Sequence, residues 1–187
     1  MTGTIFFGLA VIAAIALAVL YNLLVKRRQL VKNGWSDIDV QLKRRADLIP
    51  QLVTTVKGYA AHERQLFEDI AAKRGAALAA GDDPAMRGAA ESELSRPVAK
   101  MIAVAEDYPE LKASNNFLEL QKQLAETEDK IEMARRFYNG AVRELNITVE
   151  SFPANLLSAP LGFSKRDYFE IETADKAVPT IDLGAPA

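Results

Sequence analysis

The side chains that could carry out chemistry in this 187-residue chain are few and scattered. His62 is the single histidine and precedes Glu63, but no second histidine completes a zinc-protease motif or a di-iron pair. Asp37 and Asp39 are two residues apart, so a helix would direct them to different sides and they do not form a carboxylate pair by spacing alone. We therefore expect His62 to face solvent or to cap a helix, and we expect no metal site.

Several classes of activity lack the residues they require. The chain has no cysteine, which excludes disulfides, thiolate catalysis and the usual structural zinc sites. Its glycines do not cluster as in a phosphate-binding loop, and no serine or threonine lies in a nucleophile motif. The formal charge is -2, and no basic stripe is interleaved with aromatic residues. We predict a protein that is not an enzyme, binds no cofactor and has no nucleic-acid partner.

Charged residues in two other places are typical of exposed helix faces. One group has acidic residues with basic partners close by in sequence: Glu126, Glu128, Asp129 and Glu132 with Lys130, Arg135 and Arg136. The other admits three interpretations, namely a lipid-facing patch, intersubunit salt bridges, or the wet side of a helix: Lys43, Arg44, Arg45 and Asp47. The last is favoured because exposed ion pairs contribute little stability.

The chain begins with a segment that could cross a membrane. Residues Ile5 to Val25 carry no charge, and about 20 apolar residues rising about 1.5 Å each span a hydrocarbon core of about 30 Å. No basic residue precedes this segment, which favours an uncleaved anchor over a cleaved signal peptide. Four basic residues follow it, and the positive-inside rule then places the bulk of the chain in the cytoplasm and the N-terminus outside: Lys26, Arg27, Arg28 and Lys32. They either only set this topology, which is favoured, or also contact anionic lipid.

Apolar residues at helical spacing predict three long helices after the anchor, over residues 35–79, 84–106 and 115–150. Gly81 and Pro84 supply a stop and a start signal, Ser114 is a candidate N-cap, and Pro50 predicts a kink or a break. The predicted fold is all-α, with an N-terminal transmembrane helix continuing into a long antiparallel three-helix bundle of coiled-coil-like pattern and an irregular C-terminal tail. The corresponding domains are residues 1–28, 29–150 and 151–187.

The lengths of the predicted helices suggest an exposed apolar stripe. The first soluble helix would be about 68 Å long and the second about 35 Å, so the second would leave the membrane-proximal part of the first uncovered. We predict that this part packs against neighbouring copies, and that its apolar residues form the interface of a homo-oligomer: Trp35, Ile38, Leu42 and Ile49. The alternative is that the apolar tail, expected to be ordered to about Ile171, folds back over the stripe.

The run WSDIDVQLKRRADLIPQLVTTVKGYAAHE, with ARRFYNGAVRELN and the tail motifs FPANLL, GF and YFE, strongly resembles the LemA family of bacterial membrane proteins. The residues that carry the resemblance lie along the whole chain after the anchor: Trp35, Asp39, Gln41, Arg44, Arg45, Asp47, Leu48, Ile49, Pro50, Leu52, Val53, Lys57, Tyr59, His62, Glu63, Arg135, Tyr138, Asn139, Asn146, Phe152, Pro153, Phe163 and Phe169. The resemblance implies one N-terminal membrane helix, a long helical bundle and no catalytic site. Family members include a protein that shapes magnetosome membranes, and others are encoded near a membrane zinc metalloprotease.

Together these features predict a membrane-anchored, self-assembling helical scaffold that organises or remodels the bacterial inner membrane. Its expected partners are the lipid bilayer and further copies of the chain. The alternative is an adaptor for a membrane protease or another membrane quality-control partner.

Overall fold

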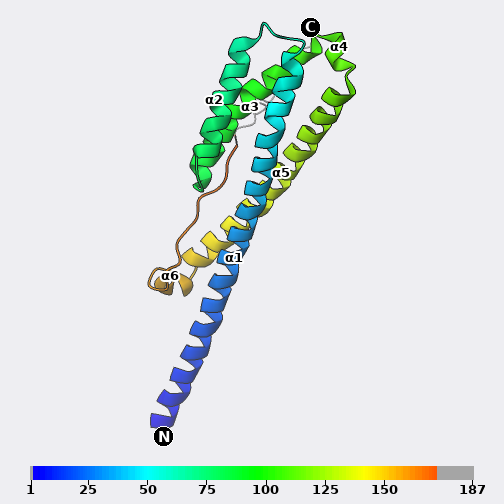
Figure 1. Ribbon diagram of the computed structural model, residues 1–187. Helices are drawn as coiled ribbons and strands as arrows, with labels where there is room; N and C mark the ends of the chain where they lie inside the picture. The colour runs from blue at the N-terminus through cyan, green and yellow to red at the C-terminus, as the bar shows by residue number, and fades with distance from the viewer. Residues whose placement is uncertain (1, 172–187) are drawn as a thin grey trace, which may run out of the picture. The chain divides into compact units, whose positions relative to one another are not determined.

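The computed structural model describes residues 2–171, and none of these residues forms a β-strand (Figure 1). The predicted all-α fold is therefore confirmed. The helices are α1 (Thr2–Lys57), α2 (Arg64–Ala79), α3 (Pro84–Glu106), α4 (Pro109–Lys112), α5 (Asn115–Glu150) and α6 (Ala154–Leu157). Of the C-terminal tail, residues 172–187 lie outside the described part of the chain.

Two helix starts lie where the sequence predicts them, at Pro84 and at Asn115. The side chain of Asp83 accepts a hydrogen bond of 2.8 Å from the backbone N–H of Met86, so it is the N-cap that α3 requires. The turn before it contains Gly81 at a φ of 70°, a conformation that glycine adopts without steric cost.

The predicted helix over residues 35–79 is instead two helices. Helix α1 ends at Lys57 and α2 begins at Arg64, and the turn between them starts at Gly58, the residue with the weakest helix propensity in this stretch. Pro50 does not end the helix, because it lies inside α1. The Thr54 hydroxyl donates a 2.8 Å hydrogen bond to the Pro50 carbonyl. The chain thus reverses direction once more than the sequence pattern indicated.

The chain divides into two compact units, and α1 and α5 each contribute to both. Unit 1 contains Met1–Asp47 and Lys122–Phe169, and unit 2 contains Leu48–Gln121 and the chain from Glu170.

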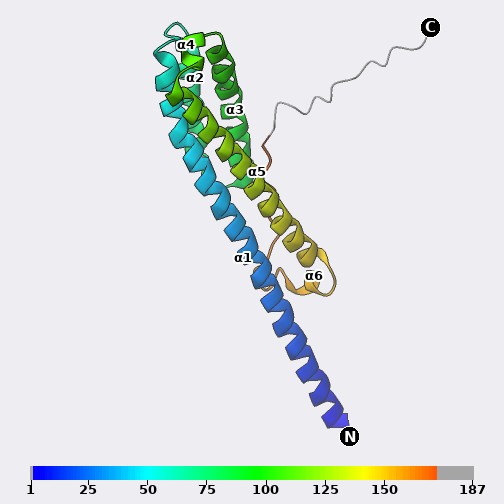
Figure 2. The same cartoon turned by 90° about the vertical axis from the view of Figure 1, so that its right-hand side faces the viewer.

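In unit 1, α5 runs antiparallel to α1. Arg45 pairs with Glu128 at 3.4 Å, and eighteen residues earlier in α1 Arg27 pairs with Glu144 at 3.3 Å. The two segments lie side by side in both views (Figures 1 and 2). The side chains buried in this unit are mainly aliphatic: Leu24, Val31, Ile38, Leu42, Leu124, Ile131, Val142 and Leu145.

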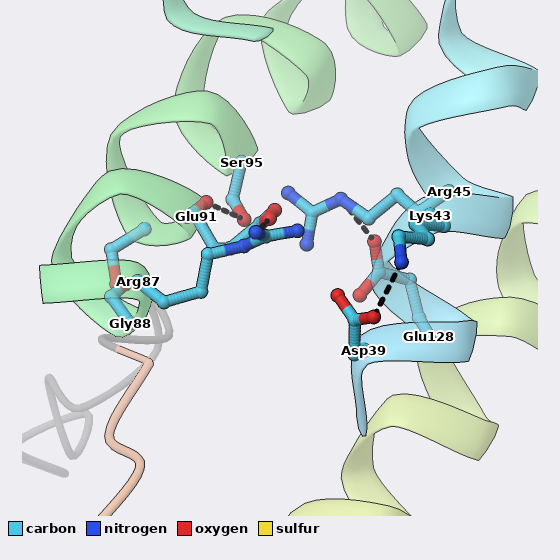
Figure 3. Close-up of polar contacts among 9 residues, drawn as sticks. Asp39, Lys43, Arg45, Arg87, Gly88, Glu91, Ser95 and Glu128 are labelled. Carbon is cyan, nitrogen blue, oxygen red and sulfur yellow. Dashed lines mark hydrogen bonds and ion pairs between the residues drawn. The ribbon is translucent and has the colours of Figure 1, made fainter. Parts of the chain in front are cut away.

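In unit 2, α2 and α3 form an antiparallel pair joined by the short turn at Gly81 (Figure 1). The part of α1 from Leu48 to Lys57 and the start of α5 belong to the same unit, and Asn116 donates a 3.3 Å hydrogen bond to the Thr55 hydroxyl. The core of this unit contains Leu52, Val56, Leu66, Phe67, Ile70, Leu94, Val98, Met101, Leu111 and Phe117. A buried ion pair of 3.0 Å between Arg87 and Glu91 lies within α3 (Figure 3).

The stripe predicted to lack a partner within its own chain is covered. Ile38, Leu42 and Ile49 are buried, and Trp35 is half-buried. The expectation of an exposed stripe was wrong because it assumed a third long helix running away from the membrane. The additional reversal after Lys57 sends α5 back along α1 in unit 1. Ile38, Leu42 and Ile49 therefore offer no exposed apolar surface of the kind that the interface prediction required.

Candidate membrane-proximal site

Helix α1 carries the membrane-spanning candidate. Among the described residues it is the one helix long and apolar enough to cross a membrane, and none of its most apolar stretch is buried inside the chain. The large side chains exposed along it include Phe6, Phe7, Ile12, Ile15 and Val19. Such a surface requires an apolar environment that this chain does not itself provide.

The four basic residues after the span have two different roles. Arg27 is paired with Glu144, and the Arg28 guanidinium lies over the Phe163 ring, 4.7 Å from its centroid. Lys26 and Lys32 are exposed. Two of the four predicted membrane-flanking cations therefore also attach α5 and the C-terminal segment to α1, whereas the other two are free to meet solvent or lipid.

An aromatic contact fixes the C-terminal segment to the end of the span. The Tyr21 and Phe163 rings meet edge to face with centroids 5.7 Å apart, and Phe163 is buried. Gly162, at a φ of 76°, turns the backbone just before it. The Phe163 N–H then donates a 2.9 Å hydrogen bond to the Ser158 carbonyl, which closes the turn after α6. Tyr21 is thus held at the edge of the apolar segment.

Trp35 has its partners within its own chain. Its ring centroid lies 5.6 Å from that of Tyr138 on α5 and 5.7 Å from that of Phe169. Tyr138 and Phe169 are both buried, so the three rings form a cluster that joins α1, α5 and the end of the C-terminal segment in unit 1.

Residues 158–169, which we call the strap, are held on α5 by polar side chains. Asn139 donates a 3.0 Å hydrogen bond to the Phe169 carbonyl and accepts one of 2.9 Å from the Phe169 N–H. Asn146 makes the same pair of bonds with Arg166, each of 2.9 Å. The Tyr138 hydroxyl donates a 2.9 Å bond to the Asp167 carbonyl. These side chains supply partners to an extended backbone that has no sheet or helix to supply them.

An ion pair adds to this attachment near the end of α5. Lys165 donates a 2.8 Å hydrogen bond to Glu150. That hydrogen bond, followed by the carboxylate charge, raises the pKa of the Lys165 ammonium above its usual value. The strap therefore has basic side chains beside the end of α5.

Farther from the span along α1, the basic residues Lys43, Arg44 and Arg45 are not all exposed. Lys43 is exposed and bonds Asp39 at 2.6 Å, whereas Arg45 is 1% exposed and reaches Glu128 (Figure 3). Arg45 thus belongs to the interior, where a charged group requires an opposite charge and hydrogen bonds. The sequence prediction of an exposed face was wrong for this residue. The spacing offered a signal, because Arg45 follows Leu42 by three residues and precedes Ile49 by four.

Three arginines line a groove of about 440 Å³ on unit 1, and for two of them, Arg135 and Arg136, the sequence predicts a solvated face. The lining residues are Arg135, Arg136, Asn139, Gly140, Arg143 and Tyr168. Arg136 forms an ion pair with Glu132. The four-residue spacing of Arg135, Asn139 and Arg143 was the available signal, since it places these side chains on one helix face. The groove presents positive charge, which suits anionic groups.

A second groove, of about 700 Å³, lies on unit 2, and its lining includes Glu63, Asp69, Lys73, Glu93 and Arg96. Lys73 and Arg96 bind Glu93 at 2.8 and 2.9 Å. The Lys73 hydrogen bond, then its charge and that of Arg96, lower the pKa of Glu93. His62 is exposed, and no group of three or more His, Asp or Glu residues in the described part of the chain could hold a metal ion.

Comparison with known proteins identifies the family of this chain. A model of the LemA family matches residues 34–183. The chain belongs to the LemA family. Similar LemA-family proteins include Magnetosome protein MamQ 2 of Paramagnetospirillum magneticum, 26% identical over 192 residues that cover 89% of this chain and 71% of the relative. Magnetosome protein MamQ of Magnetospirillum gryphiswaldense is 22% identical over 179 residues, covering 82% of this chain and 66% of the relative. Family membership and the exposed apolar helix together indicate a membrane-associated protein.

Proposed function

We propose that this LemA-family protein is a membrane-anchored helical scaffold that organises or remodels the bacterial inner membrane. It spans the bilayer once, with the N-terminus outside and the bulk of the chain in the cytoplasm. Its partners are lipids and further copies of the chain, and it has no catalytic activity. The relatives named as magnetosome proteins favour a role at a membrane.

The observation that carries the proposal is the continuity of α1 from the apolar span into unit 1. Helix α1 is unbroken from Thr2 to Lys57, and the Tyr21–Phe163 and Arg27–Glu144 contacts begin at the end of the apolar segment. No flexible linker separates the anchor from the packed part of unit 1. A rigid connection of this kind transmits the orientation of a soluble domain to its anchor, and many anchors held at one angle impose curvature on a bilayer.

Self-association needs a surface other than the buried stripe of α1. Helix α5 exposes Met133 and Phe137 one turn apart, and we assign them to the contact between copies. Leu118 provides a matched control, because it is a similarly exposed apolar residue on the same helix.

Electron microscopy of the full-length protein in a mild detergent tests this proposal. We expect large ordered assemblies that dissociate in Phe137→Glu and persist in Leu118→Glu. Vesicles that contain the wild-type protein should become tubular or scalloped, and those that contain Phe137→Glu should remain round. Small uniform particles and round vesicles for the wild type would contradict the scaffold. Copurification of such particles with a membrane protease at fixed stoichiometry would instead indicate the adaptor function.

A further inference from the structure

The turn after α5 and the short helix α6 that follows it each expose a large apolar side chain. Phe152 is 80% exposed and Leu156 is 66% exposed. Single exposed apolar residues are common on protein surfaces, so exposure alone does not indicate a function. The level at which Phe152 and Leu156 lie relative to the membrane span of α1 does indicate one.

The ion pairs of unit 1 give the level of this turn relative to the membrane span. Arg27, which pairs with Glu144, lies two residues or about 3 Å beyond Val25, the end of the apolar segment. Helix α5 continues for six residues from Glu144 to Glu150, which is about 9 Å in the opposite direction along α1. The end of α5 therefore lies about 6 Å inside the end of the span.

One further contact and the burial of one residue agree with this level. Phe163 of the strap meets Tyr21, four residues inside the end of the apolar segment. Leu24 is fully buried although most of the apolar segment before it is exposed, so other parts of the chain cover α1 at this point. The α5–α6 turn thus lies at the level of the last turns of the span, and Figures 1 and 2 draw α6 at this level of α1.

Exposed basic residues lie next in sequence to the contacts that set this level. Lys26 of α1 and Lys165 and Arg166 of the strap are exposed, and Glu150, the nearby carboxylate at the end of α5, is paired with Lys165. Exposed apolar side chains beside exposed cations are the combination that binds the interface of an anionic bilayer, because the apolar groups enter the acyl boundary while the cations meet headgroup phosphates.

We propose that residues 151–157 are a second membrane contact, which inserts Phe152 and Leu156 into the leaflet from which α1 emerges. This inference rests on the proposed membrane anchoring. Two points of attachment fix both the tilt of α1 and its rotation about its own axis, whereas a lone span fixes neither. An apolar wedge inserted beside the span also expands one leaflet alone, which gives each subunit a means of bending the membrane.

Spin labelling tests the insertion directly, because the chain has no cysteine and any introduced cysteine is the single labelling site. Full-length Phe152→Cys and Leu156→Cys are labelled with a nitroxide and reconstituted into vesicles of phosphatidylcholine and phosphatidylglycerol. Power saturation then compares accessibility to oxygen, which concentrates in the acyl region, with accessibility to a water-soluble nickel chelate. Ile12→Cys is the control within the span. Ala125→Cys is the aqueous control, because Ala125 is exposed on α5 nineteen residues before Glu144, about 28 Å farther from the span.

We expect labels at positions 152 and 156 to favour oxygen over the nickel chelate, as the label at Ile12 does, and the label at Ala125 to show the reverse. Nickel accessibility at 152 and 156 equal to that at Ala125 would overturn the insertion. Loss of accessibility to both reagents, with spin–spin broadening, would overturn it in favour of a contact between copies. Aqueous behaviour at Ile12 would instead overturn the membrane anchoring on which the inference rests.

Discussion

The side-chain amide of Asn139 binds both backbone polar groups of Phe169, donating to the carbonyl at 3.0 Å and accepting from the N–H at 2.9 Å. Phe169 is itself buried against Trp35, so this single amide fixes the end of the strap on the aromatic cluster of unit 1. The attachment depends on one side chain that is both donor and acceptor, which only an amide supplies in this geometry.

Replacing Asn139 should therefore loosen the strap. We expect Asn139→Ala to reduce stability by about 1–3 kcal/mol, because two backbone groups of Phe169 lose their partners. Asn139→Asp should cost at least as much, since it keeps the acceptor but places a carboxylate oxygen against the Phe169 carbonyl. Trypsin provides the measurement, because Lys165 and Arg166 lie in the strap and cleavage after them requires its release. Asn155→Ala, at an exposed position of α6, should leave the cleavage rate unchanged.

Gly34 permits the close approach of α1 and α5. A Cβ atom at this position would lie 3.0 Å from the Tyr138 Cα and 3.1 Å from the Phe137 Cδ1, and the first of these is backbone that cannot move alone. We expect Gly34→Ala to destabilise by about 1–3 kcal/mol through overpacking, despite the higher helix propensity of alanine.

The matched control is Gly75→Ala on α2, where an added Cβ meets nothing within 4 Å. This variant should gain about 0.5–1 kcal/mol. Thermal melts followed by circular dichroism measure both, at about 2–4 °C per kcal/mol for a chain of this size. Equal shifts of the same sign in the two variants would contradict the close packing at Gly34.

Ile38→Asp distinguishes a core position from an interface position. Because Ile38 is fully buried within one chain, the aspartate would place an unpaired charge in the interior of unit 1. We expect a loss of more than about 4 kcal/mol, seen as a large fall in helical signal at 222 nm and in Tm. The neighbouring exposed Val40→Asp should change stability by no more than about 0.5 kcal/mol. If Ile38→Asp kept its helicity but formed a smaller oligomer than the wild type, Ile38 would belong to an interface between copies and not to the core.

The sequence predicted what depends on local signals. Helix α3 begins at Pro84 and α5 begins directly after Ser114, because the signals that start a helix act within one turn. It did not predict that α1 ends at Lys57, because the apolar stripe continues at Leu66 and Ile70 across the break. Both helices pack into the core of unit 2 and the spacing continues through the turn between them, so the pattern alone did not show the reversal. The direction of α5, and with it the burial of Ile38 and Leu42, followed from that one turn.

The strap contacts were beyond a reading of periodicity for a different reason. Asn139 and Phe169 are thirty residues apart, and hydrogen bonds from a helix to an extended segment impose no repeat on either sequence. The family resemblance singled out Tyr138, Asn139, Asn146 and Phe169 without giving them a role. In the structure all four residues take part in the contacts that attach the strap to α5 and the aromatic cluster.

The ion pair between Lys73 and Glu93, which joins α2 to α3, should make a small contribution that depends on pH. The pKa of Glu93 is lowered from its usual 4.5, first by the hydrogen bond from Lys73. Its contribution is therefore present above pH 4.5 and is lost as the pH falls through the lower folded value. The pKa of Lys73 is raised from 10.5 by the same bond, so its contribution is present below pH 10.5 and is lost as the pH rises through the higher folded value.

Between these two pH limits the Lys73–Glu93 pair stabilises unit 2. Glu93→Gln should lower Tm at pH 7 by no more than about 2 °C, because both side chains are partly exposed and their charges are screened by solvent. The difference from wild type should shrink as the pH is lowered from 7 towards 3, because protonation of Glu93 removes the same charge. It should also shrink in 1 M salt. Glu68→Gln removes a carboxylate whose pair with Arg64 is almost fully exposed, so it is the matched control and should leave Tm unchanged at both pH values. A Glu93→Gln deficit that is the same at pH 3 and pH 7 would show that packing, and not charge, joins α2 to α3 at this position.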